Sequence, residues 1–175
     1  DVLYNHWGPS DMSLWQYDGW NPSEMGGIYF YNDWRAVTPW GDTRPDYGRD
    51  EVRQYIRDNA LYWLEEFRLD GLRVDGTKWI RATDDGGTDI PEGWTLLQWL
   101  NDEIDAHDSG KLIICEDLDG TDWMTKGTGA GGAGFDSQWD VYWIHPIRGV
   151  IETIHDSDRS MWTVRDSVMA VYNGD

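Results

Sequence analysis

Apolar side chains recur at helical spacing in several parts of the 175-residue chain. From Asp50, the expected N-cap, they fall at the intervals of a helix face and predict a helix that ends near Asp70-Gly71. A loop is expected from there to about Gly93, and a second helix follows that stops before Ser109-Gly110. Two further helices are predicted near the end of the chain, at about 146–156 and 159–172.

Short segments with the pattern of strands precede these helices or lie between them. They are residues 1–6 (DVLYNH), 70–76 (DGLRVDG) and 111–117 (KLIICED), and a short apolar piece at 135–142 is a candidate fourth. In DGLRVDG, alternation places Leu72 and Val74 on one side of the strand and Arg73 and Asp75 on the other. KLIICED is expected to be a buried parallel strand. Strands that alternate with helices predict a parallel sheet with crossover helices, and hence an α/β fold.

Each predicted strand ends in polar or charged residues, namely Asn5-His6, Asp75 and Glu116-Asp117. In a (β/α)8 TIM barrel, active-site side chains gather at this end of the strands. A complete barrel takes about 250 residues, so we expect a partial barrel, roughly strands 3 to 6 with their helices. Residues 1–175 would then be a fragment of a single catalytic domain, with a long Trp- and Gly-rich loop subdomain at residues 7–49 after the first strand.

The composition narrows the classes of ligand. With 14 Lys and Arg against 33 Asp and Glu, the formal net charge is -19, which argues against a nucleic-acid partner or an anionic membrane and favours a neutral ligand. No stretch approaches the roughly 20 apolar residues of a membrane span. The single Cys115 has no partner for an internal disulfide and is expected to be a buried apolar residue.

Tryptophan is unusually frequent, with 13 in the chain. About half of these side chains are expected to pack in the core. Others lie in a polar, Gly- and Pro-rich stretch, where flat aromatic faces commonly serve as stacking platforms for ligands. Because the chain is strongly acidic, we expect those platforms to face sugars in preference to nucleobases. These loop residues are Trp7, Trp15, Trp20, Trp34 and Trp40.

Two carboxylates on separate strand ends suit the hydrolysis or transfer of glycosidic bonds. A retaining glycosidase needs a carboxylate nucleophile and a carboxylic acid about 5–5.5 Å apart. Asp75 fits the nucleophile, because the adjacent Arg73 would favour its ionised form. Glu116 fits the acid, because it follows the apolar run 113–115 and an apolar setting favours protonation. Asp117 would point to the opposite face and is therefore less favoured as the acid.

Three segments match a known family in order and spacing. DVLYNH fits the pattern D-x-x-x-N-H, GLRVD fits G-x-R-x-D, and the glutamate of ICED falls where a third motif places the acid. The chain resembles the α-amylase superfamily, glycoside hydrolase family thirteen. The segments PWGDTRPDYGRDEVRQYI and GGAGFDSQWD look like the glycogen and starch branching-enzyme group, so the resemblance covers essentially the whole chain.

The resemblance implies an enzyme that acts on α-1,4/α-1,6-glucans by a retaining double displacement, with Asp75 as nucleophile and Glu116 as general acid/base. Asp1 and Asn5 would carry structural roles, and Asn5 would be a calcium ligand if a structural Ca²⁺ were present. No other cofactor is implied. Trp79 stands where α-amylases usually have His, which weakens the interpretation as a calcium-linked amylase. The substrate contacts assigned on this basis are His6, Arg73, Lys78 and Tyr4.

One expected motif has no match. The family's fourth motif, His-Asp, supplies a third carboxylate that steadies the transition state. His155-Asp156 has the right letters but lies in a polar, helical context, so we expect the true motif beyond Asp175. The expected partners are therefore an α-glucan substrate and the remainder of the barrel.

Several functions remain open at this point. The flanking segments favour a branching enzyme, whereas Lys78 favours an α-amylase-type hydrolase. Acidic residues on successive strand ends can also hold Mg²⁺ in a barrel enzyme, although Arg73 and the loop tryptophans argue against that. A non-catalytic relative, or an inactive truncated fragment, is the alternative from another class.

Overall fold

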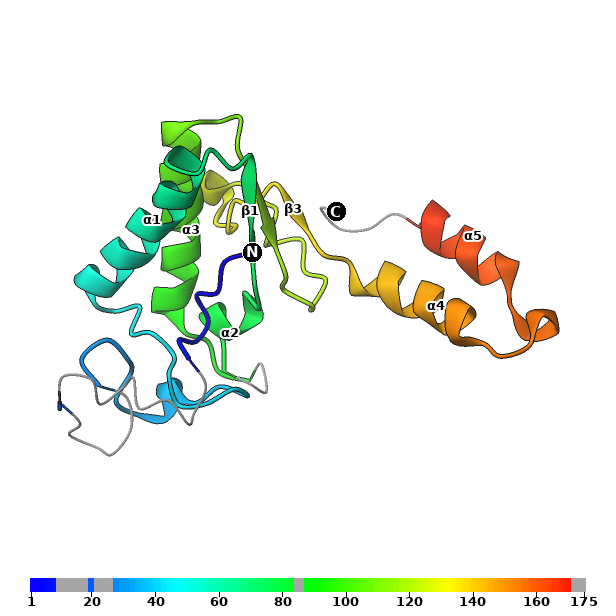
Figure 1. Ribbon diagram of the computed structural model, residues 1–175, viewed down its shortest axis with the longest axis horizontal. Helices are drawn as coiled ribbons and strands as arrows, with labels where there is room; N and C mark the ends of the chain where they lie inside the picture. The colour runs from blue at the N-terminus through cyan, green and yellow to red at the C-terminus, as the bar shows by residue number, and fades with distance from the viewer. Residues whose placement is uncertain (9–18, 21–26, 84–86, 171–175) are drawn as a thin grey trace.

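A small parallel sheet lies at the centre of the protein in the computed structural model, which describes residues 1–8, 19–20, 27–83 and 87–170 (Figure 1). Its strands pair in the order β1-β2-β3. Val2 adds a single parallel bridge to Val74, so the predicted first strand is reduced to one bridging residue. The predicted parallel α/β arrangement is confirmed for this part of the chain. The strands are β1 (Gly71–Val74), β2 (Leu112–Cys115) and β3 (Ser137–Gln138).

Helices connect and cover these strands. Helices α2 and α3 form the crossover from β1 to β2, and α1 lies beside α3 (Figure 1). Helices α4 and α5 pack on each other and project away from the sheet (Figure 1). The α-helices are α1 (Asp50–Glu65), α2 (Lys78–Arg81), α3 (Pro91–His107), α4 (Val141–Glu152) and α5 (Met161–Met169). Short 3-10 helices span Trp34–Ala36, Thr128–Ala130 and Asp156–Asp158.

The ends of the central helices differ from the prediction. Helix α1 ends at Glu65 instead of near Asp70, because Arg68 adopts a left-handed conformation (φ 53°) that turns the chain toward β1. Its N-cap is Arg49, and Asp50 is the first helical residue, where its charge suits the helix dipole. Helix α3 begins at Pro91, before the expected position, since proline is well tolerated in the first turn.

The remaining helices also shift. Helix α2 was not predicted, because a segment of 4 residues is too short to show helical periodicity. Helix α4 begins at Val141, where the side chain of Asp140 accepts a hydrogen bond from the backbone N–H of Tyr142. Helix α5 is shorter than predicted at both ends, and Ser160 caps it by accepting from the N–H of Thr163.

The core lies between the sheet and helices α1 and α3. Leu72 and Val74 of β1 are buried on that side, as the alternation predicted, together with Ile113 and Cys115 of β2. The prediction that β2 is buried on both faces is wrong, because Leu112 is 57% exposed and Ile114 is only partly buried. The second face of the sheet is therefore available for polar side chains, and it carries Arg73. Core side chains from the helices include Ile56, Leu64, Leu97, Leu100 and Ile104.

The described part of the 7–49 loop is tied to this body by a buried cation. The guanidinium of Arg44 donates to the backbone oxygens of Arg35 (2.6 Å), Val37 (2.7 Å) and Ala82 (3.1 Å). The bonds to Arg35 and Val37 hold the loop to itself, and the bond to Ala82 joins it to the end of α2. Trp15 lies outside the described residues. No helix in the described ranges has the length and apolar character needed to cross a membrane.

Candidate active site

Arg73 joins the two carboxylates that follow β1 and β2. Its Nη1 lies 2.7 Å from Asp75 Oδ1, and its Nη2 lies 2.6 Å from Glu116 Oε2. Parallel pairing explains the meeting: Val74 is opposite Cys115, so the residues just beyond them leave the sheet at the same edge. The predicted ion pair between Arg73 and Asp75 is confirmed, and these three predicted residues form one cluster.

The expected apolar setting of Glu116 is wrong. Besides the guanidinium of Arg73, the backbone N–H of Gly76 donates to Glu116 Oε2 at 3.1 Å. The apolar run before Glu116 places alternate side chains in the core, while Glu116 itself turns toward the polar edge. Its neighbours along the chain were therefore a poor guide to its contacts.

The ring of Trp139 packs against the guanidinium of Arg73. The guanidinium carbon lies 4.0 Å from the centroid of the Trp139 ring, a cation–π contact. Trp139 follows β3, and its backbone N–H donates to the carbonyl of Cys115 at 2.9 Å. Asp1 also approaches Nη1 of Arg73, at 3.3 Å. Sequence reasoning missed Trp139, although its position just after a short strand was a signal that could have identified it.

Asn5 fixes the orientation of Asp75. Its buried side-chain amide donates to the backbone oxygen of Asp75 at 2.8 Å and to Oδ2 of the same residue at 3.1 Å. The next residue, Gly76, has a left-handed φ of 50°, and a Cβ there would lie 2.6 Å from Asn5 Nδ2. Glycine is thus required both by the backbone conformation and by the close approach of Asn5.

His6 lies beside Asp75 beneath a tryptophan ring. The rings of His6 and Trp40 stack with centroids 4.8 Å apart and planes inclined by 13°, and Trp79 contacts Trp40 edge-on. Burial lowers the pKa of His6 below its ordinary value, and the negative charge of Asp75 opposes this only in part. Nδ1 of His6 faces Oδ1 of Asn5. Trp40 is thus a loop tryptophan placed against a predicted site residue.

Asp117 points away from this cluster, as the alternation predicted. It is buried and accepts from Arg81 Nη2 (2.6 Å), Arg81 Nε (2.8 Å) and the hydroxyl of Thr77 (3.2 Å). The hydrogen bonds that Arg81 donates to Asp117 raise the pKa of Arg81 against the opposing effect of burial. Lys78 Nζ pairs with Asp119 Oδ1 at 2.8 Å. Burial acts to raise the pKa of Asp119, but hydrogen bonds from Lys78 and Arg81 outweigh it and lower that pKa.

Tyr4 is not brought to the cluster. The side chain is 3% exposed and its hydroxyl donates to Asn59 Oδ1 of α1 at 2.9 Å. Burial raises the pKa of Tyr4. Tyr4 is therefore a core residue and not, as predicted, a contact of the substrate. Alternation within residues 1–6 turns its side chain toward α1.

Curated sequences similar to the chain are 1,4-alpha-glucan branching enzymes. GlgB of Photobacterium profundum is 31% identical over 169 residues, covering 87% of this chain and 22% of that protein. GlgB 2 of Streptomyces avermitilis is 34% identical over 152 residues, covering 77% of this chain and 26% of that protein. The maltogenic alpha-amylase AmyB of Thermotoga neapolitana shares the fold, with a TM-score of 0.57 at 22% identity over 96% of this chain and 33% of that chain.

The chain belongs to the α-amylase superfamily. The predicted resemblance to that superfamily, and to its branching enzymes, is confirmed. The chain spans only about a quarter of the length of these curated relatives. No family model matches it.

The superfamily's fourth motif has no counterpart at the cluster in the described residues. His155 and Asp156 lie in the turn between α4 and α5, on the hairpin that projects away from the sheet (Figure 1). The carboxylate of Asp156 is 90% exposed and pairs with Arg159 at 2.6 Å.

Both polar atoms of the Asn5 side chain, the residue assigned as a possible calcium ligand, have neighbours in the cluster. The amide nitrogen of Asn5 is engaged by Asp75, and its oxygen faces His6. Within the described ranges, no three His, Cys, Asp or Glu side chains gather as a metal site.

Proposed function

We propose that this chain forms part of the catalytic domain of a retaining α-glucan enzyme, most like a 1,4-α-glucan branching enzyme. The observation that carries the proposal is the bridge from Arg73 to Asp75 (2.7 Å) and to Glu116 (2.6 Å) at one edge of a parallel sheet. Retaining chemistry needs two carboxyl groups that flank the scissile bond about 5–5.5 Å apart. The similarity to curated GlgB proteins supports the choice of α-glucan as substrate.

In this mechanism Asp75 attacks the anomeric carbon while Glu116 donates a proton to the departing glycosidic oxygen. The C–O bond to the leaving chain breaks as the bond to Asp75 forms. In the second step, Glu116 takes a proton from an acceptor hydroxyl, whose oxygen displaces Asp75 from the anomeric carbon. A sugar hydroxyl as acceptor gives a branch, and water gives hydrolysis.

The other residues of the cluster position these two. Arg73 holds both carboxylates, and Trp139 supports its guanidinium from the side. Asn5 orients Asp75 through its amide. Burial lowers the pKa of His6, and because its Nδ1 faces the acceptor oxygen of Asn5, the Nε2 of the neutral ring can accept a hydrogen bond from a sugar hydroxyl.

The proposal extends to the rest of the domain. The described sheet would correspond roughly to strands 3 to 6 of a (β/α)8 barrel, with residues 7–49 as a loop subdomain inserted after the first strand. The remaining strands would supply the third carboxylate and cover the exposed edge. The 175 residues alone would then have little or no activity.

The test uses the protein with its complete barrel and amylose as substrate. We expect a fall in iodine staining with new α-1,6 links, and loss of activity in Asp75→Asn. A matched control is Asp166→Asn, because Asp166 is an exposed carboxylate on α5 with side-chain exposure of 65%. Retained activity in Asp75→Asn, or no activity in the unsubstituted protein, would overturn the proposal.

Glu116→Gln separates the acid from the nucleophile. Without a proton donor, turnover of amylose should fall strongly, whereas the first step on an α-maltosyl fluoride should be less affected because fluoride leaves without much help from an acid. If both substrates lose activity equally, the assignment of Glu116 as the acid is wrong.

The alternative function is an α-amylase-type hydrolase, which Lys78 at the start of α2 favours by its match to that group. Its Nζ lies beside Asp119, so reaching a sugar would require that ion pair to open. A rise in reducing ends without new α-1,6 links would favour hydrolysis over branching.

A further inference from the structure

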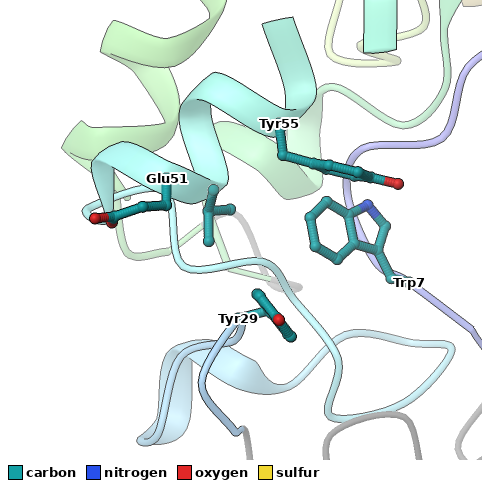
Figure 2. A pocket seen from close by; sticks show the side chains of 5 residues that line it. Trp7, Tyr29, Glu51 and Tyr55 are labelled. Carbon is teal, nitrogen blue, oxygen red and sulfur yellow. The ribbon is translucent and has the colours of Figure 1, made fainter. Parts of the chain in front are cut away.

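An aromatic pocket lies outside the carboxylate cluster, between α1 and the loop. Its volume is about 420 Å³, and it is lined by Trp7, Tyr29, Glu51, Val52 and Tyr55 (Figure 2). It shares no residue with the cluster of Arg73, Asp75 and Glu116. The volume falls within the roughly 300–1,000 Å³ typical of small-molecule sites.

Two of the rings that line this pocket, Trp7 and Tyr55, are held by contacts with other rings of the protein. Trp7 packs edge-on against Phe30 (centroids 5.8 Å apart) and Tyr55 (5.1 Å), both with planes inclined by 74°. The backbone N–H of Trp7 donates to Thr43 at 3.0 Å. Tyr55 is nevertheless 59% exposed and Tyr29 48% exposed, so much of their surface remains available. Fixed rings with open faces lose little entropy when they bind.

Polar groups border these rings on the side of α1. A second hollow of about 480 Å³ adjoins the aromatic pocket and shares Glu51 and Tyr55 with it. Gln54 and Asp58, joined by a 2.7 Å hydrogen bond, line this second hollow. Together the hollows offer aromatic faces followed by amide and carboxylate acceptors along one helix. That sequence of groups suits a chain of linked rings that carry hydroxyls.

The charges exclude other classes of ligand. Among the described residues that line the two hollows, the charged side chains are all acidic, which disfavours an anionic ligand. A cation held by aromatic faces would gain further from a carboxylate directed into the pocket. Figure 2 instead shows the carboxylate of Glu51 pointing away from the rings of Trp7 and Tyr55. A neutral polyhydroxylated ligand carries no charge that the acidic side chains would repel, and it needs no carboxylate directed into the pocket.

We propose that this pocket binds a segment of neutral α-glucan at a site separate from the reacting carboxylates. The choice of ligand rests on the proposed function. A chain held there would raise the local concentration of glucan near the site of reaction without taking part in the chemistry. Stacking on the exposed rings of Tyr55 and Tyr29 would supply the binding energy, and the polar groups of α1 would select hydroxyls.

The test is calorimetric titration of maltoheptaose into the complete protein carrying Asp75→Asn, so that no turnover occurs. Tyr55→Ala and, separately, Tyr29→Ala should weaken one binding event by about tenfold or remove it, a change of about 1.4 kcal/mol. The matched control is Tyr62→Ala, because Tyr62 is a 51% exposed tyrosine on the same helix that does not line the pocket. Its affinity for maltoheptaose should be unchanged.

The outcomes distinguish this site from the proposed function. Weaker binding in the tyrosine variants supports the site even if no α-1,6 links form in the activity assay, in which case the proposed function alone fails. Unchanged binding in both variants overturns the site. A lower melting temperature without a change in affinity would show that another part of the protein fills the pocket, and would also overturn it. If the protein binds tetramethylammonium, loses it at high salt and does not bind maltoheptaose, the pocket is a cation site and the glucan site is overturned.

Discussion

Nη2 of Arg73 lies 2.6 Å from Oε2 of Glu116, on the neighbouring strand, while Nη1 of the same guanidinium contacts Asp75. The forked geometry of arginine allows one side chain to hold two carboxylates at once. Arg73 is therefore a direct link between the proposed nucleophile and the proposed acid, beside the bonds from Asn5 to Asp75 and from Gly76 to Glu116.

Arg73→Lys should abolish this double contact, since an ammonium group is a point charge without a fork. We expect kcat on amylose to fall by about 100-fold, comparable with the loss of one preorganised donor in an active site. Arg57→Lys is the matched control, because Arg57 also bridges two carboxylates, Asp58 and Glu103, but on the helical face of the molecule. Equal kcat in Arg73→Lys and the unsubstituted protein would contradict the assigned role.

The pKa of His6 should respond to Trp40. Burial lowers this pKa, and the Trp40 ring covers one face of the imidazole. Trp40→Ala should therefore raise the pKa of His6 toward the ordinary value of about 6.5, measured by NMR titration of the imidazole protons. Trp34→Ala, which removes a 55% exposed loop tryptophan, should leave it unchanged.

The same shift predicts a pH dependence of stability. Because the pKa of His6 is lower in the folded than in the unfolded state, the unfolded state binds the proton more readily. Above about pH 6.5 this difference in pKa has no effect on the free energy of unfolding. As the pH falls below that value, it destabilises the fold. Urea denaturation at several pH values should show that His6→Gln loses less free energy of unfolding on acidification than the unsubstituted protein does. A pKa of His6 at or above 6.5 would contradict both predictions.

Arg81→Met should destabilise the fold strongly, because it leaves the buried carboxylate of Asp117 without its cation. We expect a loss of about 3–5 kcal/mol in the free energy of unfolding, measured by urea denaturation. Arg148→Met is the control, since Arg148 pairs with Glu152 on the exposed surface of α4, and no measurable change is expected. If the two variants unfold at the same urea concentration, the buried pair has no special role.

Gly93→Ala should destabilise the contact between α2 and α3. A Cβ at Gly93 would overlap the backbone carbonyl of Ile80, which cannot move without shifting α2. A loss of about 1–3 kcal/mol is expected from such overpacking. A Cβ at Gly149, in helix α4, would have no neighbour within 4 Å. Gly149→Ala should therefore stabilise the fold by up to about 1 kcal/mol. Thermal melts of the two variants that shift in the same direction would refute this packing.

Much of the site followed from local pattern. Alternation in DGLRVDG placed Arg73 opposite the buried Leu72 and Val74, and the strand–helix order implied parallel strands. Because parallel strands end at one edge, the order of the elements was enough to place Asp75 and Glu116 together. The helices were recognised by periodicity, but their ends were misplaced where a single backbone conformation, such as that of Arg68, decided them.

The sequence by itself determined the α/β class, the superfamily and the residues at the strand ends, because these depend on periods and spacings within short segments. Only the tertiary structure decided that Arg73 also holds Glu116, that Trp139 and Trp40 cover Arg73 and His6, and that Tyr4 faces the core. Those contacts join segments far apart in the chain. Their geometry depends on how loops close and side chains pack, and no local pattern of residues records that.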